Sequence, residues 1–332
     1  MASNVLILGA GASRHHDFPV SREIWTRICL NRTDLSDGAL RGVGLDPDAF
    51  ENFAERLAQS GVLSVDAFAE YVIDDPDDLY MAKGLIAYTL GIYEIRASLR
   101  GRDRDWYRTL ANILIGLDLD SFPRRDIAII TFNYERSLER YLLDCLQGRF
   151  IKKHSLEEIV AAFRRMPIIH IYGQMGALPD FQIPRAPVCP YDRISNPTQL
   201  RQAVSGMHLL PEIKRDDRVG NRDAARMFIK DATGSVTFLG FAYDPENLRA
   251  LDLANTCGGK PVSGTTFGFG PDAPIDSLNR RMHEITAGHW SPFRPDRDVF
   301  AALEAHPDRI LGVDRGAGPP AIETTSIEPD VV

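Results

Sequence analysis

The sequence predicts an α/β protein in which a Rossmann-like, doubly wound parallel sheet carries a large helical insertion after its first strand. Apolar, β-branched runs typical of buried strands recur along the chain, at residues 4–8, 127–131, 167–173 and 235–241, with a weaker one at 264–270. Between them, apolar residues recur at three- and four-residue intervals, as in amphipathic helices. Strands that alternate with helices favour a parallel sheet.

The helical insertion follows the first strand and runs from about residue 21 to 117. Its helical stretches read "SREIWTRICL", "DAFAEYVI", "LYMAKGLIAYTLGIYEIRASL" and "DWYRTLANILIGL". Because so long a connection exceeds an ordinary crossover, we expect a lobe that covers one edge of the sheet, within a single domain spanning residues 1–311. Residues 312–332 are rich in Pro, Gly, Thr and acids, and they predict a flexible tail.

Composition narrows the class of protein. The 332 residues carry a formal charge of −8, so direct nucleic-acid binding is not expected. The four cysteines lack C-x-x-C spacing, which predicts no metal site and fits the reduced thiols of a cytoplasmic protein. Residues 1–12 lack the basic segment and cleavage site of a signal peptide. No apolar run approaches the roughly 18 residues of a membrane span.

A glycine turn closes the first strand, with the sequence Gly9-Ala10-Gly11-Ala12-Ser13. Small residues here let backbone amides approach a pyrophosphate, although many α/β turns contain two glycines for steric reasons alone. Arg14 stands at the third small position of the dehydrogenase fingerprint, and no second strand follows about 20 residues on. The turn therefore predicts nucleotide binding and disfavours a dehydrogenase. Arg14 is a candidate phosphate ligand because its guanidinium is always charged.

Polar residues also follow the other strands, and Asn133 and Glu135 are the most conspicuous. An asparagine at a strand-to-helix turn is often a helix cap, and Glu135 is open to the same interpretation. The strand ends at 9–13, 131–135, 170–173 and 239–244 would nevertheless meet at one edge of a parallel sheet, where ligands bind. We therefore expect one cleft, with Asn133 facing a ligand.

These four stretches, in this order, resemble the sirtuin-like NAD hydrolases, specifically their bacterial anti-phage defence branch. The similar motifs are "GAGAS…FP", "TFNYE", "HIYG" and "LGF…D", with weaker counterparts in "SVDAFAEYV" and "GTTFGFG", over roughly residues 4 to 290. The resemblance implies that NAD is the substrate and that Asn133 lies beside its nicotinamide ribose. The cofactor-binding residues expected from it are Gly9, Ala10, Gly11, Ala12, Ser13, Arg14, Thr131, Phe132, Tyr172, Gly173, Gly240 and Phe241.

The chain departs from sirtuins at three points. The paired cysteines of the deacylating enzymes are absent, which weakens a deacylase assignment. Their catalytic histidine precedes the glycine, where this chain has Tyr172, and His170 lies two positions earlier. Because alternate residues of a strand share a face, both can look into the cleft. His170 is the favoured catalytic histidine, the alternative being a core histidine bonded to a backbone carbonyl. Asp17 replaces a glycine common in the family.

NAD cleavage needs few residue types. The pyridinium leaves as neutral nicotinamide, so the site must stabilise a ribosyl cation and position a water. Asn133 can hold the water or a ribose hydroxyl, and His170 can accept a proton. We predict an NAD glycohydrolase that depletes NAD in anti-phage defence, restrained by homo-oligomerisation or by a separately encoded partner. The alternatives are a deacylase or ADP-ribosyltransferase, and a noncatalytic regulator that binds NAD or ADP-ribose.

Overall fold

The computed structural model describes residues 3–181, 186–216, 220–267 and 275–312, and these residues form a parallel α/β fold. A six-stranded sheet has the order β3-β2-β1-β4-β5-β6 with every neighbouring pair parallel. The predicted fold class is confirmed. The strands are β1 (Asn4–Leu8), β2 (Ile127–Thr131), β3 (Ile168–His170), β4 (Val236–Leu239), β5 (Val262–Gly264) and β6 (Trp290–Pro292).

The central strands are apolar because helices cover both faces of the sheet. Every residue of β1, β2 and β4 is buried, so the strands lack the alternation of a half-exposed sheet. Ile7 pairs with Ile130 of β2 on one side and Phe238 of β4 on the other. The chain runs outward from β1 through β2 and β3, then crosses to β4. The order therefore reverses between β1 and β4, where parallel sheets bind ligands.

Two details at the β6 end of the sheet differ from the prediction. The weak strand expected at 264–270 lies earlier, at Val262–Gly264, and residues 268–270 fall outside the described ranges. β6 was not predicted, because three residues with a proline give no strand periodicity. The predicted tail beyond Gly312 also lies outside the described residues.

All regular elements in the connection from β1 to β2 are helices, as predicted. It contains the short 3-10 helices η1 (Ala10–His16) and η2 (Arg96–Leu99), and the helices α1 (Ser21–Cys29), α2 (Asp37–Val43), α3 (Pro47–Gln59), α4 (Val65–Val72), α5 (Pro76–Gly91) and α6 (Trp106–Leu114). Asp75 caps α5, since its carboxylate accepts the amides of Asp77 (2.9 Å) and Asp78 (3.2 Å). The acidic stretch at residues 74–78, with the sequence "DDPDD", therefore leads into this helix.

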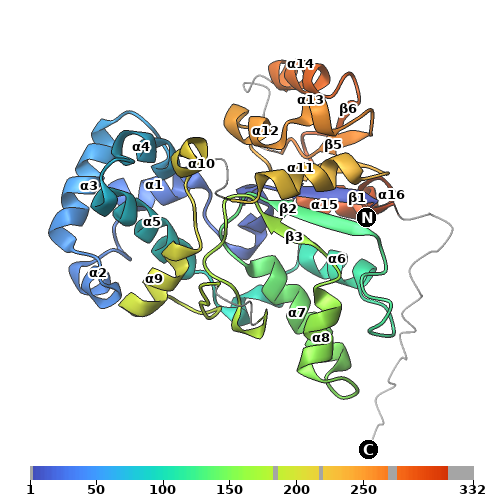
Figure 1. Ribbon diagram of the computed structural model, residues 1–332, viewed down its shortest axis with the longest axis horizontal. Coiled ribbons are helices and arrows are strands. Elements are labelled where there is room, and N and C mark those ends of the chain that lie inside the picture. The colour runs from blue at the N-terminus through green and yellow to red at the C-terminus, as the bar shows by residue number, and fades with distance from the viewer. Residues whose placement is uncertain (1–2, 182–185, 217–219, 268–274, 313–332) are drawn as a thin grey trace, which may run out of the picture.

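Helices α1–α5 form a lobe at one side of the sheet (Figure 1). Two helices from the connection between β3 and β4 complete it, because α9 (Pro197–Ser205) packs on α5 and α10 (Leu210–Arg215) packs on α4. The lobe is therefore built from two distant parts of the sequence. We call α1–α5, α9 and α10 the helical lobe.

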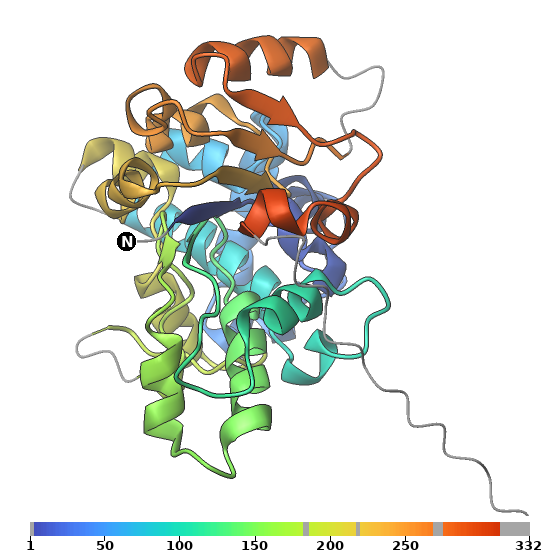
Figure 2. The same ribbon diagram turned by 90° about the vertical axis from the view of Figure 1, so that its right-hand side faces the viewer.

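The remaining helices flank the sheet. They are α7 (Ser137–Phe150), α8 (Leu156–Phe163), η3 (Pro179–Phe181), α11 (Arg222–Asp231), α12 (Pro245–Leu251), α13 (Leu253–Thr256), α14 (Ile275–Ile285), α15 (Val299–Ala305) and α16 (Pro307–Leu311). In Figure 2 the green α7 and α8 lie toward the β3 end of the sheet and the orange α14 lies beside β6. No helix within the described ranges is long and apolar enough to cross a membrane.

Candidate functional site

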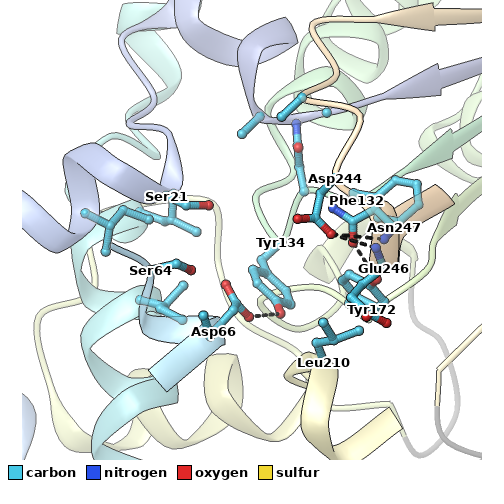
Figure 3. Close-up of a pocket in the computed structure, with 18 of the residues that line it drawn as sticks. Ser21, Ser64, Asp66, Phe132, Tyr134, Tyr172, Leu210, Asp244, Glu246 and Asn247 are labelled. Atoms are coloured by element: carbon cyan, nitrogen blue, oxygen red, sulfur yellow. Dashed lines mark hydrogen bonds between the residues drawn. The ribbon is translucent and has the colours of Figure 1, made fainter. Parts of the chain in front are cut away.

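A cavity of about 560 Å³ lies between the helical lobe and the carboxyl ends of β1, β2 and β4. Its volume is within the roughly 300–1,000 Å³ typical of small-molecule sites. In Figure 3, Ser21, Ser64 and Asp66 approach from the lobe, and Phe132, Tyr172 and Asp244 lie across from them. The predicted cleft therefore exists at the expected edge of the sheet.

The cavity gathers half of the predicted site residues. Its wall includes Gly9, Ala10, Ser13, Phe132, Asn133, Tyr172 and Phe241. The predicted residues that do not line it are Gly11, Ala12, Arg14, Thr131, His170, Gly173 and Gly240. Most of the second group lie in the same turns as the first, so the sequence located the turns better than the side chains within them.

The glycine turn after β1 packs directly on the turn after β4. The Gly11 amide donates to the carbonyl of Gly240 (2.9 Å), and a Cβ at Gly11 would lie 2.8 Å from that oxygen. Gly240 has a φ of 59°, and a Cβ there would lie 2.0 Å from the Ala12 nitrogen. The contact between these two turns is thus sufficient to explain both glycines.

Arg14 points away from the cavity. Its guanidinium is exposed and pairs with Glu23 at 2.6 Å. It lines a neighbouring hollow, which shares Phe18 and Pro19 with the cavity wall. Asp17, which stands where the family often has glycine, has a φ of 67°. Aspartate tolerates this left-handed conformation better than most side chains, so the replacement preserves the turn.

Asn133 is held by its amide nitrogen. Nδ2 donates to Ser13 Oγ (3.1 Å) and to Glu135 Oε1 (3.2 Å). Because a carboxylate only accepts hydrogen bonds, the nitrogen must be the atom that faces Glu135. Oδ1 therefore points the other way, and it finds no hydrogen-bond partner among the described atoms. A side chain on the cavity wall thus carries a fixed but unused acceptor.

Glu135 both orients Asn133 and caps a helix. Its Oε1 also accepts the Ser13 hydroxyl, and its Oε2 accepts the amide of Ser137, the first residue of α7, at 2.6 Å. The carboxylate is buried. The two interpretations of Glu135 open at the level of the sequence are therefore compatible, because its two oxygens serve different partners.

His170 does not face the cavity, contrary to expectation. β3 ends at His170, and the chain turns before Tyr172, so the alternation of a strand no longer relates the two side chains. Nδ1 of His170 donates to the carbonyl of Asn133 (2.7 Å), and Nε2 bonds to Glu139 on α7. The histidine is a buried core residue bonded to a carbonyl, which was the alternative interpretation.

The partners of His170 also decide its protonation. Burial lowers the pKa of its imidazole, but Glu139 and the Asn133 carbonyl outweigh burial and raise the pKa above its ordinary value. Both partners are acceptors, an arrangement that favours hydrogen on both ring nitrogens. An imidazolium in this setting has no lone pair with which to accept a proton, and its geometry suits a support for Asn133.

Tyr172, unlike His170, lines the cavity. Its ring packs edge-on against Phe132, with centroids 5.3 Å apart, and Phe132 packs against Phe241 at 5.0 Å. Its hydroxyl donates to Oδ1 of Asn247 (2.6 Å). Burial raises the pKa of this phenol well above neutrality. The three rings form an apolar wall, and the hydroxyl remains protonated.

Several polar residues of the cavity were not predicted as site residues. They are Ser64, Asp66, Glu70, Lys214, Asp244, Glu246 and Asn247. Most belong to the helical lobe or to the start of α12, and on the sequence they read as ordinary helix caps and exposed helix faces. Asp66 lies in "SVDAFAEYV", where the resemblance was the only available signal.

The described residues contain no group of three or more His, Cys, Asp or Glu side chains arranged to hold a metal. Neither protein-family models nor curated proteins gave a match to this chain.

Proposed function

We propose that the protein is an NAD glycohydrolase that cleaves NAD to nicotinamide and ADP-ribose. The observation that carries this proposal is Asn133, which lines the cavity and whose buried Oδ1 has no hydrogen-bond partner among the described residues. A buried acceptor that the protein itself leaves unpaired is costly, and a ribose hydroxyl or the attacking water would satisfy it. The resemblance to sirtuin-like NAD hydrolases supports the same assignment.

The two sides of the cavity suit the two parts of NAD. Gly9, Ala10 and Ser13 form a wall of backbone and small side chains, which leaves room for the pyrophosphate. The rings of Phe132, Phe241 and Tyr172 would lie against the nicotinamide half of the ligand. Because acidic residues line this cavity, its potential favours the cationic pyridinium and the ribosyl cation that forms as the bond breaks.

In the proposed reaction the ribose C1′–N1 bond breaks, and its electron pair neutralises the pyridinium. Nicotinamide therefore leaves without a general acid. Asn133 Oδ1 orients the water or ribose hydroxyl, and Glu135 and Ser13 keep the amide from rotating. His170 supports the carbonyl of Asn133 from behind. This replaces the catalytic role expected for His170 with a positioning role.

An enzyme that depletes NAD must be restrained in a resting cell. We propose control by homo-oligomerisation or by a separately encoded partner, in a cytoplasmic anti-phage system. A monomer with full constitutive activity would contradict this part of the proposal.

The test is release of nicotinamide by the purified protein incubated with NAD, with and without an acyl-lysine peptide. Release without the peptide supports the glycohydrolase. Release only with the peptide, accompanied by deacylation, supports a deacylase, and transfer of labelled ADP-ribose to protein supports a transferase. Binding of NAD without any cleavage supports a noncatalytic regulator.

A further inference from the structure

The cavity contains a carboxylate, Asp66, that has no role in the reaction proposed above. Asp66 lies in the first turn of α4 and lines the cavity from the helical lobe (Figure 3). Its Oδ1 accepts the hydroxyl of Tyr134 (3.1 Å), and Tyr134 directly follows Asn133. The turn that carries Asn133 is therefore tied to Asp66 across the cleft.

Burial raises the pKa of Asp66 to about 6, against the lowering effect of the Tyr134 hydrogen bond. The nearby cations have other partners. Lys214 bonds to Glu70 and lies 3.8 Å from Glu246, and Lys83 lies 3.1 Å from Glu212. A half-buried carboxylate without a cation, in a cleft, is a typical functional group.

The helices around Asp66 carry both positively and negatively charged side chains. The charged residues on the helices packed against α4 are Arg22, Glu23 and Arg27 on α1, Asp77, Asp78 and Lys83 on α5, and Glu212, Lys214 and Arg215 on α10. Asp244 and Glu246 face the same cavity from the start of α12, together with Glu135, Tyr172 and Tyr134. His208 offers its backbone carbonyl to the Tyr134 hydroxyl (3.0 Å). Among these, Tyr134 is the group that bonds to the Asp66 carboxylate.

We propose that Asp66 is the base that accepts the proton of the attacking water, an inference that rests on the glycohydrolase assignment. His170 cannot fill this role, because both of its nitrogens are engaged with acceptors. Tyr172 cannot fill it either, because its hydroxyl stays protonated and donates to Asn247. Asp66 is a carboxylate that lines the cavity and bonds to Tyr134 in the turn that carries Asn133, and burial raises its pKa to about 6.

The step balances without a further reactant. The C1′–N1 bond breaks, and its electrons remain on nicotinamide. The water oxygen forms the new bond to C1′, while one of its protons passes to the Asp66 carboxylate and then to solvent. The products are nicotinamide, ADP-ribose and one proton. The Tyr134 hydroxyl holds the carboxylate in place during this transfer.

The test compares Asp66→Asn with Asp48→Asn, which makes the same change in the first turn of α3 at an exposed position. A general base typically contributes about 10²–10⁴-fold in rate, so Asp66→Asn should lower kcat by about 100-fold or more while KM changes little. Asp48→Asn should behave as wild type. Thermal melting of each variant checks that it is folded.

The pH profile separates a base from a structural residue. Wild-type turnover should fall as the pH drops below about 6, and the residual turnover of Asp66→Asn should lack this acid limb. The hydrogen bond from Tyr134 lowers the pKa of Asp66 in the wild type, so its removal raises that pKa. Tyr134→Phe should therefore move the acid limb to higher pH. An active, folded Asp66→Asn variant, or one that keeps the limb, overturns the base assignment alone. Wild-type protein that releases no nicotinamide overturns the proposed function and this inference with it.

Discussion

His170 fixes the backbone of Asn133, because its Nδ1 donates to the backbone carbonyl of Asn133 at 2.7 Å. The other ring nitrogen bonds to Glu139 on α7. The residue expected to act on the ligand thus fixes the turn of the residue that does face the cavity. The amide of Asn133 is further held by Ser13 and Glu135.

Replacement of Asn133 by alanine should abolish nicotinamide release and leave the fold nearly intact. Loss of one positioned polar group commonly costs on the order of a hundredfold or more in rate, whereas the lost hydrogen bonds are worth about 1 kcal/mol each. Turnover measured beside a melting curve gives the answer, with Asn52→Ala on an exposed face of α3 as the matched control. Wild-type turnover by Asn133→Ala would leave Asn133 without a role in the reaction.

The His170–Glu139 pair predicts a specific pH dependence of stability. The pKa of His170 is raised above its ordinary value of 6.5 in the folded protein. Protonation therefore stabilises the fold fully below pH 6.5, and this contribution is lost as the pH rises through the raised pKa. The free energy of unfolding should differ most between wild type and His170→Gln near pH 6, and least in alkaline solution. Denaturant unfolding across this range tests it, and a difference that grows with pH would contradict the pairing.

The sequence predicted the sheet and the edge of it at which the cavity lies, because those features depend on patterns that are local. The apolar run Ile127–Thr131 and the glycine turn at Gly9 each carry their own signal, and a parallel sheet brings such strand ends together. The prediction for His170 was wrong about its direction because it assumed that the strand continued to Tyr172. Where β3 ends depends on tertiary contacts, which no local pattern records.

Asp66 could not be identified as a site residue from local patterns for a different reason. It lies on the cavity wall because α4 packs within the helical lobe, against α1 and α5 and against α10, which is more than a hundred positions along the chain. Burial in the folded protein raises its pKa. Long-range packing of a helical insertion leaves no periodicity in the sequence, so the lobe side of the site required the structure.

Substitution of Glu135 by glutamine should reduce kcat by at least about tenfold. Its carboxylate accepts from Ser13, Asn133 and the Ser137 amide, and a glutamine would present a donor to one of these donors. Asn133 would then lose its orientation, so kcat should fall more than KM rises. Steady-state kinetics measure this split. A Glu135→Gln protein that is less stable than wild type but has an unchanged kcat would show that Glu135 only caps α7.

Tyr172→Phe should keep turnover within about tenfold of wild type. The substitution removes only the hydroxyl that donates to Asn247 at 2.6 Å, and a neutral hydrogen bond is worth about 1 kcal/mol. Tyr172→Ala, in contrast, removes the ring that packs on Phe132 and should weaken NAD binding. Calorimetric titration with NAD and nicotinamide release distinguish the two variants. An inactive Tyr172→Phe protein would give the hydroxyl a direct catalytic role.

Glu94 and Arg136 form a buried ion pair. Arg136, at the start of α7, bonds to both oxygens of Glu94 and also donates to the carbonyls of Gly176, Cys189 and Pro190. It therefore ties the connection after β3 to the turn that carries Asn133. Removal of one partner of a buried pair leaves the other charge uncompensated and typically costs about 3–5 kcal/mol.

Glu94→Gln should therefore lower the free energy of unfolding by about 3–5 kcal/mol. Glu51→Gln is the matched control, because Glu51 pairs with Arg32 at an exposed position and such pairs contribute about 0–1 kcal/mol. Urea unfolding midpoints of both variants give the comparison. A Glu94→Gln protein as stable as Glu51→Gln would show that the carbonyl partners alone hold Arg136, and the carboxylate would then have no structural role.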